Sequence, residues 1–151
     1  MIKFERFLGL IVIMALIFKF FHLTGGGVLL TFSLTSLVCI YHLFGFAFFN
    51  QIDLSRIFDK KSYQGISAFR VLTAIGAGIG LSYTCLGILF KFQHWPGANI
   101  VLLAGLIFTS AILLIALIRF FKTERDDFYK FIFFRVAIIG GFGLILILLP
   151  N

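Results

Sequence analysis

Five long apolar stretches separated by short polar segments constrain the fold of this chain more than any other feature. They cover residues 7–21, 28–49, 71–90, 100–118 and 131–149. A helix needs about 20 apolar residues to cross the hydrocarbon core of a bilayer, and the last four stretches come close to that length. The first reaches it if residues 2–6 are included and the Lys19 side chain extends to the headgroups. The sequence therefore predicts an all-α integral membrane helical bundle with five transmembrane helices.

The composition also indicates a membrane protein. With 61% hydrophobic and 13% charged residues and a mean hydropathy of +1.11, the chain differs from soluble domains, in which about a quarter of the residues are charged. The formal net charge of +7 does not indicate a nucleic-acid partner, because the basic residues are spread between apolar stretches and form no dense patch. Cys39 and Cys85 lie inside apolar stretches, which is typical of small buried residues and not of disulfides.

The N-terminus resembles a secretory signal, because Lys3 and Arg6 precede an apolar run. No small-residue cleavage site follows that run. We therefore expect this segment to be retained as a membrane helix.

A pattern at the end of the first apolar stretch returns 72 residues later. Residues 18–22 read F-K-F-F-H, and residues 90–94 read F-K-F-Q-H. A second match repeats F-R-V of residues 69–71 at residues 134–136. We interpret the chain as a single transmembrane domain, 1–151, made of tandem hairpin repeats in a 2+2+1 arrangement. Repeat 1 covers about residues 1–50, repeat 2 about 66–121, and a half-repeat about 131–151.

The two repeated turns carry residues typical of a membrane interface. Pro96 disfavours helical dihedrals at the preceding residue and Gly97 lets the chain reverse, so residues 92–99 predict a helix-turn-helix reversal. A lysine stem lies in hydrocarbon while its ammonium reaches the headgroups, and an indole ring lies at the same level. The periplasmic turn motif comprises Lys19, His22, Lys91, His94, Trp95, Pro96 and Gly97.

The basic residues predict the orientation of the chain. Eleven of the 13 Lys and Arg residues lie at the N-terminus or around the segments after the second and fourth stretches, on one side of the membrane. Only Lys19 and Lys91 lie on the other side. Because cytoplasmic segments carry the excess of Lys and Arg, we expect a multi-pass inner-membrane protein with a cytoplasmic N-terminus. Both histidine-containing turns and the C-terminus are then periplasmic.

His22 and His94 occupy matching positions, each three residues after a lysine. One hypothesis is that the two imidazoles meet and bind a metal or haem iron. We favour the alternative that each histidine holds a helix end at the interface, because a metal site normally has three or four ligands and no Cys, Asp or Glu lies near either turn. His42, inside the second stretch, is expected to bond to a neighbouring helix. We therefore expect no cofactor.

The six acidic residues all fall in or beside the segments assigned to the cytoplasm. Ion-driven membrane machines place an ionisable group at membrane depth, since the ion must bind on its way across. Without a carboxylate in the bilayer interior, we do not expect autonomous ion coupling. No nucleophile lies beside a base, so the sequence does not predict an enzyme. The acidic residues are Glu5, Asp53, Asp59, Glu124, Asp126 and Asp127.

Glycine is most frequent in the third and fifth apolar stretches. The run G-A-G-I-G at residues 76–80 lacks the dinucleotide-binding spacing and follows no strand, so we do not expect a nucleotide site. Small residues four apart let helices approach closely in lipid. We expect Gly76, Gly80 and Gly141 to lie at helix contacts, within the bundle or between subunits.

The run F-K-F-Q-H-W-P-G-A at residues 90–98, followed by Leu102, Gly105 and Leu106, closely resembles the membrane hairpin of the GldL family, also called PorL. GldL-type proteins are cytoplasmic-membrane motor proteins of gliding motility and type IX secretion in Bacteroidetes. The resemblance implies an inner-membrane protein with this turn in the periplasm. The basic residues predict the same orientation.

This chain also departs from the family. In GldL the second helix of the hairpin carries a glutamate soon after the glycine that corresponds to Gly105, and that acid is implicated in proton use. The matching positions here are Thr109 and, in the first repeat, Leu37. The long cytoplasmic C-terminal region of GldL has no counterpart in this sequence, and five spans are predicted instead of two. The resemblance therefore implies the scaffold without the motor activity.

Three functional hypotheses remain after these observations. The first is a non-enzymatic GldL-related scaffold or complex subunit in the lipid bilayer that associates with itself or with another membrane protein's transmembrane helix. The second is a metal- or haem-binding membrane protein that uses His22 and His94. The third and weakest is a small repeat-type transporter, for which only hydroxyls and His42 are available to line a cavity at the midplane.

Overall fold

The computed structural model describes residues 1–122 and 127–149, and nearly all of them lie in helices. Two short 3-10 turns, η1 (Leu54–Arg56) and η2 (Lys60–Tyr63), lie between α2 and α3. The predicted acidic residues Glu124 and Asp126, and the basic residue Arg125, lie outside the described residues, as does the C-terminal Asn151. The helices are α1 (Ile2–Phe20), α2 (Gly26–Phe49), α3 (Ala68–Gln93), α4 (Ala98–Lys122), α5 (Asp127–Arg135), the π-helical turn η3 (Val136–Gly140) and α6 (Gly141–Leu148).

Four helices in the described residues are long and apolar enough to cross a membrane by length and composition: α2, α3, α4 and the continuous segment Asp127–Leu148. The predicted first span corresponds to α1, which has 19 residues and carries four charged side chains. The all-helical membrane fold class is therefore confirmed, with α1 as a shorter fifth helix.

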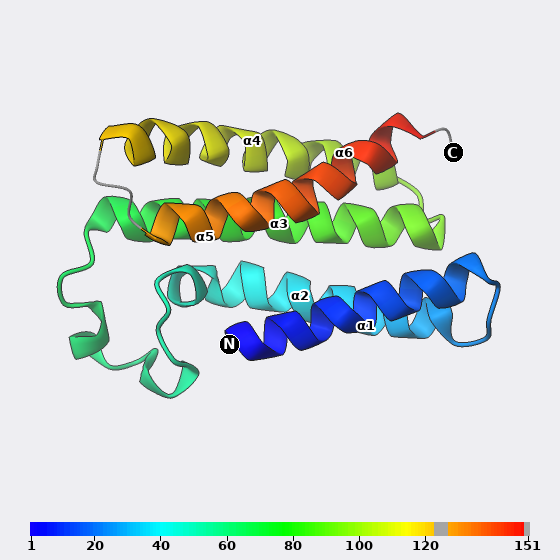
Figure 1. The fold of residues 1–151 in the computed structure, drawn as a ribbon, viewed down its shortest axis with the longest axis horizontal. Coiled ribbons are helices and arrows are strands. Elements are labelled where there is room, and N and C mark those ends of the chain that lie inside the picture. The colour runs from blue at the N-terminus through cyan, green and yellow to red at the C-terminus, as the bar shows by residue number, and fades with distance from the viewer. Residues whose placement is uncertain (123–126, 150–151) are drawn as a thin grey trace.

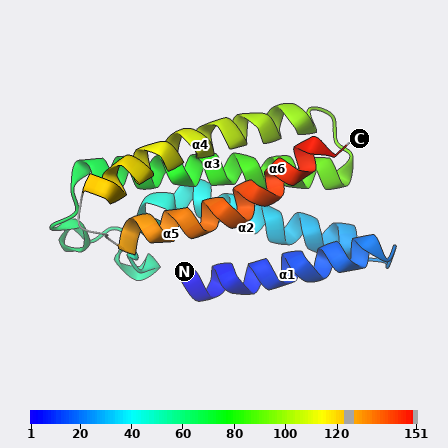
Figure 2. The same ribbon diagram turned by 45° about the horizontal axis from the view of Figure 1, so that its top comes forward.

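The helices lie side by side along the long axis of the molecule (Figure 1). α3 lies between α2 and α4, α1 lies against α2, and the α5–α6 segment crosses α3 on one face. The view turned by 45° shows the same neighbours (Figure 2). The N-terminus and the α2–α3 connection lie at one end of the bundle, whereas both short helix turns and the C-terminal end lie at the other (Figure 1). Which of these two ends faces the cytoplasm stays a prediction.

Close backbone contacts place α3 at the centre. A Cβ atom built on Gly45 of α2 would lie 2.9 Å from the Cα of Gly78, and one built on Gly87 would lie 2.5 Å from the Cα of Leu102 in α4. Helices in lipid associate through packing and hydrogen bonds, because the surrounding acyl chains are as apolar as the helix surfaces. The small residues of α3 therefore allow two neighbouring helices to pack against it closely.

Candidate functional site

The two short turns have the same backbone geometry. His22 and His94 both have φ of 55°, in the left-handed region. In the first turn the N–H of His22 donates to the carbonyl of Lys19 (3.2 Å), and the N–H of Leu23 donates to that of Phe18 (2.8 Å). The second turn has the equivalent bonds 72 residues later, at 3.3 and 2.9 Å. This pair of bonds is a Schellman motif, which ends a helix by satisfying its last carbonyls. Each histidine therefore terminates a helix.

Both histidine side chains are exposed. Within the described part of the chain, no three His, Cys, Asp or Glu side chains are grouped where they could hold a metal ion. In the structure, the backbone conformation of His22 and His94 ends a helix in each case. His42 lies on the exposed face of α2, and its Nδ1 is 3.2 Å from the Ser82 hydroxyl of α3. That contact is the expected bond to a neighbouring helix.

A cluster of polar groups joins the two turns, and we call it the turn cluster (Lys19, Gly27, Thr31, Phe92 and Gln93). The Lys19 ammonium donates to the carbonyl of Phe92 and to Gln93 Oε1 (3.1 Å). Gln93 Nε2 donates to the Gly27 carbonyl at 2.8 Å and to the Thr31 hydroxyl at 2.7 Å. The first helical hairpin is therefore fastened to the second at this end. Gln93 was not among the predicted site residues, although it is the polar difference between the two copies of the F-K-F-x-H pattern.

The other residues of the turn motif bind within the second turn and to the C-terminal end. Lys91 Nζ donates to Asn99 Oδ1 at 3.0 Å and to the Leu149 carbonyl at 3.4 Å. The Trp95 ring packs edge-on against Phe90, with the centroids 5.1 Å apart. Pro96 and Gly97 form the exposed bend, and Gly97 has φ of 80°. In the described residues, Lys19 therefore binds the second hairpin, whereas Lys91 binds within its own turn and to the C-terminal end.

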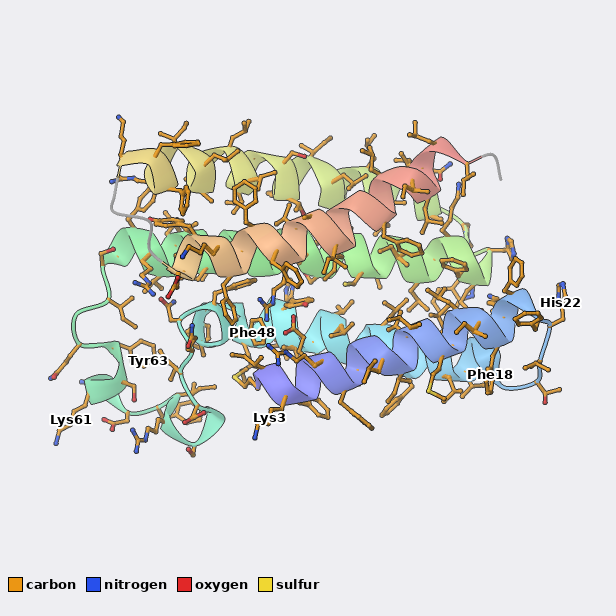
Figure 3. All side chains as sticks on the ribbon, viewed as in Figure 1. Lys3, Phe18, His22, Phe48, Lys61 and Tyr63 are labelled. Carbon is orange, nitrogen blue, oxygen red and sulfur yellow. The ribbon has the colours of Figure 1, made fainter. Side chains whose placement is uncertain are left out.

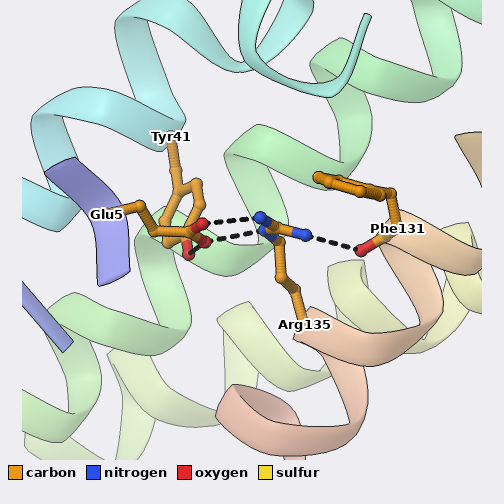
Figure 4. A network of polar contacts seen from close by, with 4 residues as sticks. All are labelled: Glu5, Tyr41, Phe131 and Arg135. Atoms are coloured by element: carbon orange, nitrogen blue, oxygen red, sulfur yellow. Dashed lines mark hydrogen bonds and ion pairs between the residues drawn. The ribbon is translucent and has the colours of Figure 1, made fainter. Parts of the chain in front are cut away.

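A buried ion pair joins the first helix to the last. Arg135 of α5 binds Glu5 of α1 with two parallel bonds, Nη2 to Oε2 at 2.5 Å and Nε to Oε1 at 2.6 Å (Figure 4). The Tyr41 hydroxyl of α2 donates to Glu5 Oε1 at 2.6 Å, and Arg135 Nη1 donates to the Phe131 carbonyl at 3.1 Å. Two parallel bonds between a guanidinium and a carboxylate form a strong, geometrically specific pair. We call Glu5, Tyr41 and Arg135 the buried triad.

The position of the buried triad corrects the expectation for Glu5. Glu5 is 9% exposed and Arg135 is 8% exposed, and the Arg135 guanidinium lies over the rings of Phe48 and Phe131 at 4.8 and 4.4 Å. Tyr41 lies eight residues before the end of α2, and Arg135 lies eight residues after the start of α5, which is about 12 Å of helix in each case. Glu5 was expected in or beside a cytoplasmic segment, and no carboxylate was expected in the interior. Both expectations are wrong for Glu5, which lies inside the bundle, because the Arg135 guanidinium, 130 residues away in the sequence, compensates its charge.

Thr109, which the resemblance predicts at the position of the GldL glutamate, lies in the contact between α3 and α4. It is 2% exposed, and its hydroxyl lies 3.3 Å from that of Thr84. A Cβ built on Gly80 would lie 2.9 Å from the backbone nitrogen of Thr109. The space at this position is therefore filled by neighbouring backbone and small side chains.

The glycines expected at helix contacts differ in their surroundings. Gly80 packs against Thr109, and Gly76 faces the Ile112 side chain, so both lie against α4. Gly141 has no atom within 4 Å of a Cβ built on it, whereas Gly143 faces Thr84 and Leu102. The π-helical turn just before Gly141 changes which residues of the last helix face inward, because such a turn contains an extra residue. The structure therefore brings Gly76 and Gly80 to helix contacts but not Gly141.

An open groove of about 940 Å³ runs along α2 from Gly27 to Phe44. Phe4 of α1 and Trp95 after α3 contribute to its apolar lining. Two of the hydroxyls along it have local partners, since Thr31 and Ser36 donate to carbonyls four residues earlier, at 2.9 and 2.8 Å. We call this feature the α2 groove, and its small side chains are Thr31, Thr35, Ser36 and Cys39.

Comparisons with known proteins support the family resemblance. Residues 76–138 match the family model of the GldL N-terminal domain. The matched segment runs from the middle of α3 through the second turn and α4 into the last helix, and it covers less than half of the chain. Comparisons with curated proteins and with solved structures give no match. Residues 76–138 are therefore similar to the GldL N-terminal domain, as the resemblance at residues 90–98 predicted.

Proposed function

We propose that this chain is a non-enzymatic subunit of an inner-membrane complex related to gliding motility and type IX secretion, and that it packs a transmembrane helix of a partner protein in the α2 groove. The N-terminus lies in the cytoplasm and the turn motif in the periplasm. The GldL domain match supports the setting. The observation that carries the proposal is the open groove along most of α2.

The chemistry of the α2 groove suits an apolar helix. Its small side chains, Thr31, Thr35, Ser36 and Cys39, allow close approach of a helix backbone, which drives association in lipid. The hydroxyls of Thr31 and Ser36 already have backbone partners, so an apolar helix could cover them without leaving an unsatisfied donor. Aromatic rings at Phe32 and Phe44 add contact area. The groove can therefore accept a helix without charged side chains.

The buried triad supports a structural role over a proton-driven one. Both oxygens of Glu5 accept bonds from Arg135 or Tyr41, so the carboxylate is fully occupied inside the protein. The position of the family's glutamate is held by Thr109, which cannot ionise. We therefore propose that this chain acts in the complex through helix packing and not through proton transfer.

The experiment is to fill the α2 groove and follow the complex. Thr35→Trp places a large ring on an exposed groove position, and Ile107→Trp, at a 62% exposed position on α4, is the matched control. We expect the wild type and Ile107→Trp to purify in mild detergent with a membrane protein or a second copy. Thr35→Trp should purify as a folded monomer. A wild type that is always monomeric and free of membrane proteins would overturn the proposal.

A further inference from the structure

The segment between α2 and α3 is a folded loop and not an open connection. Ile52 and Ile57 are buried against Ala47 of α2, and the Tyr63 ring stacks on Phe46 with the centroids 6.3 Å apart. The Tyr63 hydroxyl donates to the Ile57 carbonyl at 2.6 Å. The loop therefore holds its remaining side chains in fixed positions at this end of the bundle.

Phe58 is the most exposed large apolar residue in the described chain, with 97% of its surface accessible. It directly follows the buried Ile57, so the folded loop holds its ring outward. Arg56, Lys60 and Lys61 are also exposed around it. The one acid among them, Asp59, accepts a bond from the backbone N–H of Lys61 at 3.0 Å. The result is an exposed aromatic ring with three exposed basic side chains within three residues of it in the sequence.

The position of the loop limits what it can contact. Its ends are fixed at Phe49 and Ala68, the ends of two membrane-spanning helices, so the loop stays close to the bilayer surface. Lys61 extends outward from the loop at the end of the bundle, and Lys3 extends outward from the start of α1, further along the long axis (Figure 3). Aromatic rings favour the boundary between headgroups and acyl chains, and basic side chains near it are attracted to anionic lipids.

We propose that Arg56, Phe58, Lys60 and Lys61 form a binding surface for anionic phospholipid headgroups of the cytoplasmic leaflet. The Phe58 ring enters the boundary between headgroups and acyl chains, and the three basic side chains contact lipid phosphates. The exposed Phe58 ring favours a lipid-binding surface over a surface that binds an acidic protein. A ring held close to the bilayer by two membrane-spanning helices contacts lipid more readily than a soluble partner.

The first test measures the depth of the ring. Phe58→Trp in a Trp95→Phe background gives a single tryptophan, and Gln64→Trp in the same background is the matched control from an exposed, polar position in the same loop. Both are placed in nanodiscs of phosphatidylcholine with or without phosphatidylglycerol, and brominated lipids quench the indole. We expect at least twofold stronger quenching at position 58 than at 64, increasing with phosphatidylglycerol. Equal quenching at both positions, or none, would overturn the proposal.

The second test measures lipid retention by native mass spectrometry. The triple variant Arg56→Gln/Lys60→Gln/Lys61→Gln should retain fewer phosphatidylglycerol molecules than the wild type. The matched control, Lys3→Gln/Arg6→Gln/Lys122→Gln, removes the same charge from exposed positions at the same end and should retain nearly all of them. Equal retention by both triple variants would contradict a specific surface. The α2 groove is separate, so this result is independent of partner binding.

Discussion

At the scale of single residues, the buried triad shows how a charged group is tolerated inside an apolar bundle. The Glu5 carboxylate has two bonds from Arg135 and one from Tyr41, and no buried side-chain polar atom in the described residues lacks a partner. Removing one member of a buried pair leaves the other charge uncompensated, which costs more than removing both. The triad therefore fixes α1 against the last helix.

We expect Arg135→Met to reduce the stability of the detergent-solubilised protein by about 3–5 kcal/mol, because Glu5 then remains buried and unpaired. The double variant Glu5→Leu/Arg135→Met should recover much of this loss. Thermal unfolding followed by circular dichroism measures both variants. A double variant that is no more stable than Arg135→Met would contradict this account.

Glycine substitutions test the close packing of α3. Gly78→Ala should destabilise the bundle by about 1–3 kcal/mol, since its Cβ would collide with the backbone of α2 at Tyr41 and Gly45. Gly141→Ala is the control, because open space surrounds that position, and it should leave stability unchanged or raise it by up to about 1 kcal/mol. Equal thermal unfolding of the two variants would refute the proposed packing.

At the scale of elements, local chemistry explains which features the sequence could predict. The turns at His22 and His94 are formed by bonds between residues three or five apart, so a short repeated pattern predicts both of them. The helices are long apolar runs, which can be recognised from the hydrophobicity of consecutive residues. The buried triad could not be predicted in this way, because Glu5 and Arg135 lie 130 residues apart in the sequence.

The last helix illustrates the same limit. Arg135 was assigned to a cytoplasmic segment, yet it lies within the continuous helix Asp127–Leu148. The π-helical turn Val136–Gly140 follows it directly and was not visible as a sequence pattern. The inward position of Gly143 in place of Gly141 follows from this irregular turn. The α2 groove depends on how α1, α2 and the end of α3 pack, so the sequence could not predict it either.

The backbone role of the histidines can be tested by His94→Gly. Glycine adopts a positive φ without strain but loses more entropy on folding, and these two effects are of similar size. We therefore expect the thermal stability to stay within about 1 kcal/mol of the wild type. Metal content measured on the same preparations distinguishes the alternative: stoichiometric metal in the wild type that is absent from His94→Gly would favour a metal site.

At the scale of the whole molecule, the charges at the two ends of the bundle predict its orientation. The N-terminus and the basic α2–α3 loop lie at one end, and both histidine turns lie at the other (Figure 1). Ser55→Cys and Thr24→Cys place a single cysteine at each end, because both positions are exposed. The background changes Cys39 and Cys85 to Ala, so that each variant reports the accessibility of one end. An impermeant maleimide added to intact spheroplasts should label Thr24→Cys and spare Ser55→Cys. The reverse pattern would invert the topology.

The proposal that this chain is a complex subunit depends most directly on what occupies the α2 groove in native membranes. A photo-crosslinking amino acid at Thr35, with Ile107 as the control position, measures this, and mass spectrometry identifies the crosslinked peptide. We predict an adduct from Thr35 to an apolar transmembrane segment of one defined membrane protein, absent from position 107. Adducts to lipid alone, or the same proteins at both positions, would contradict the proposed function.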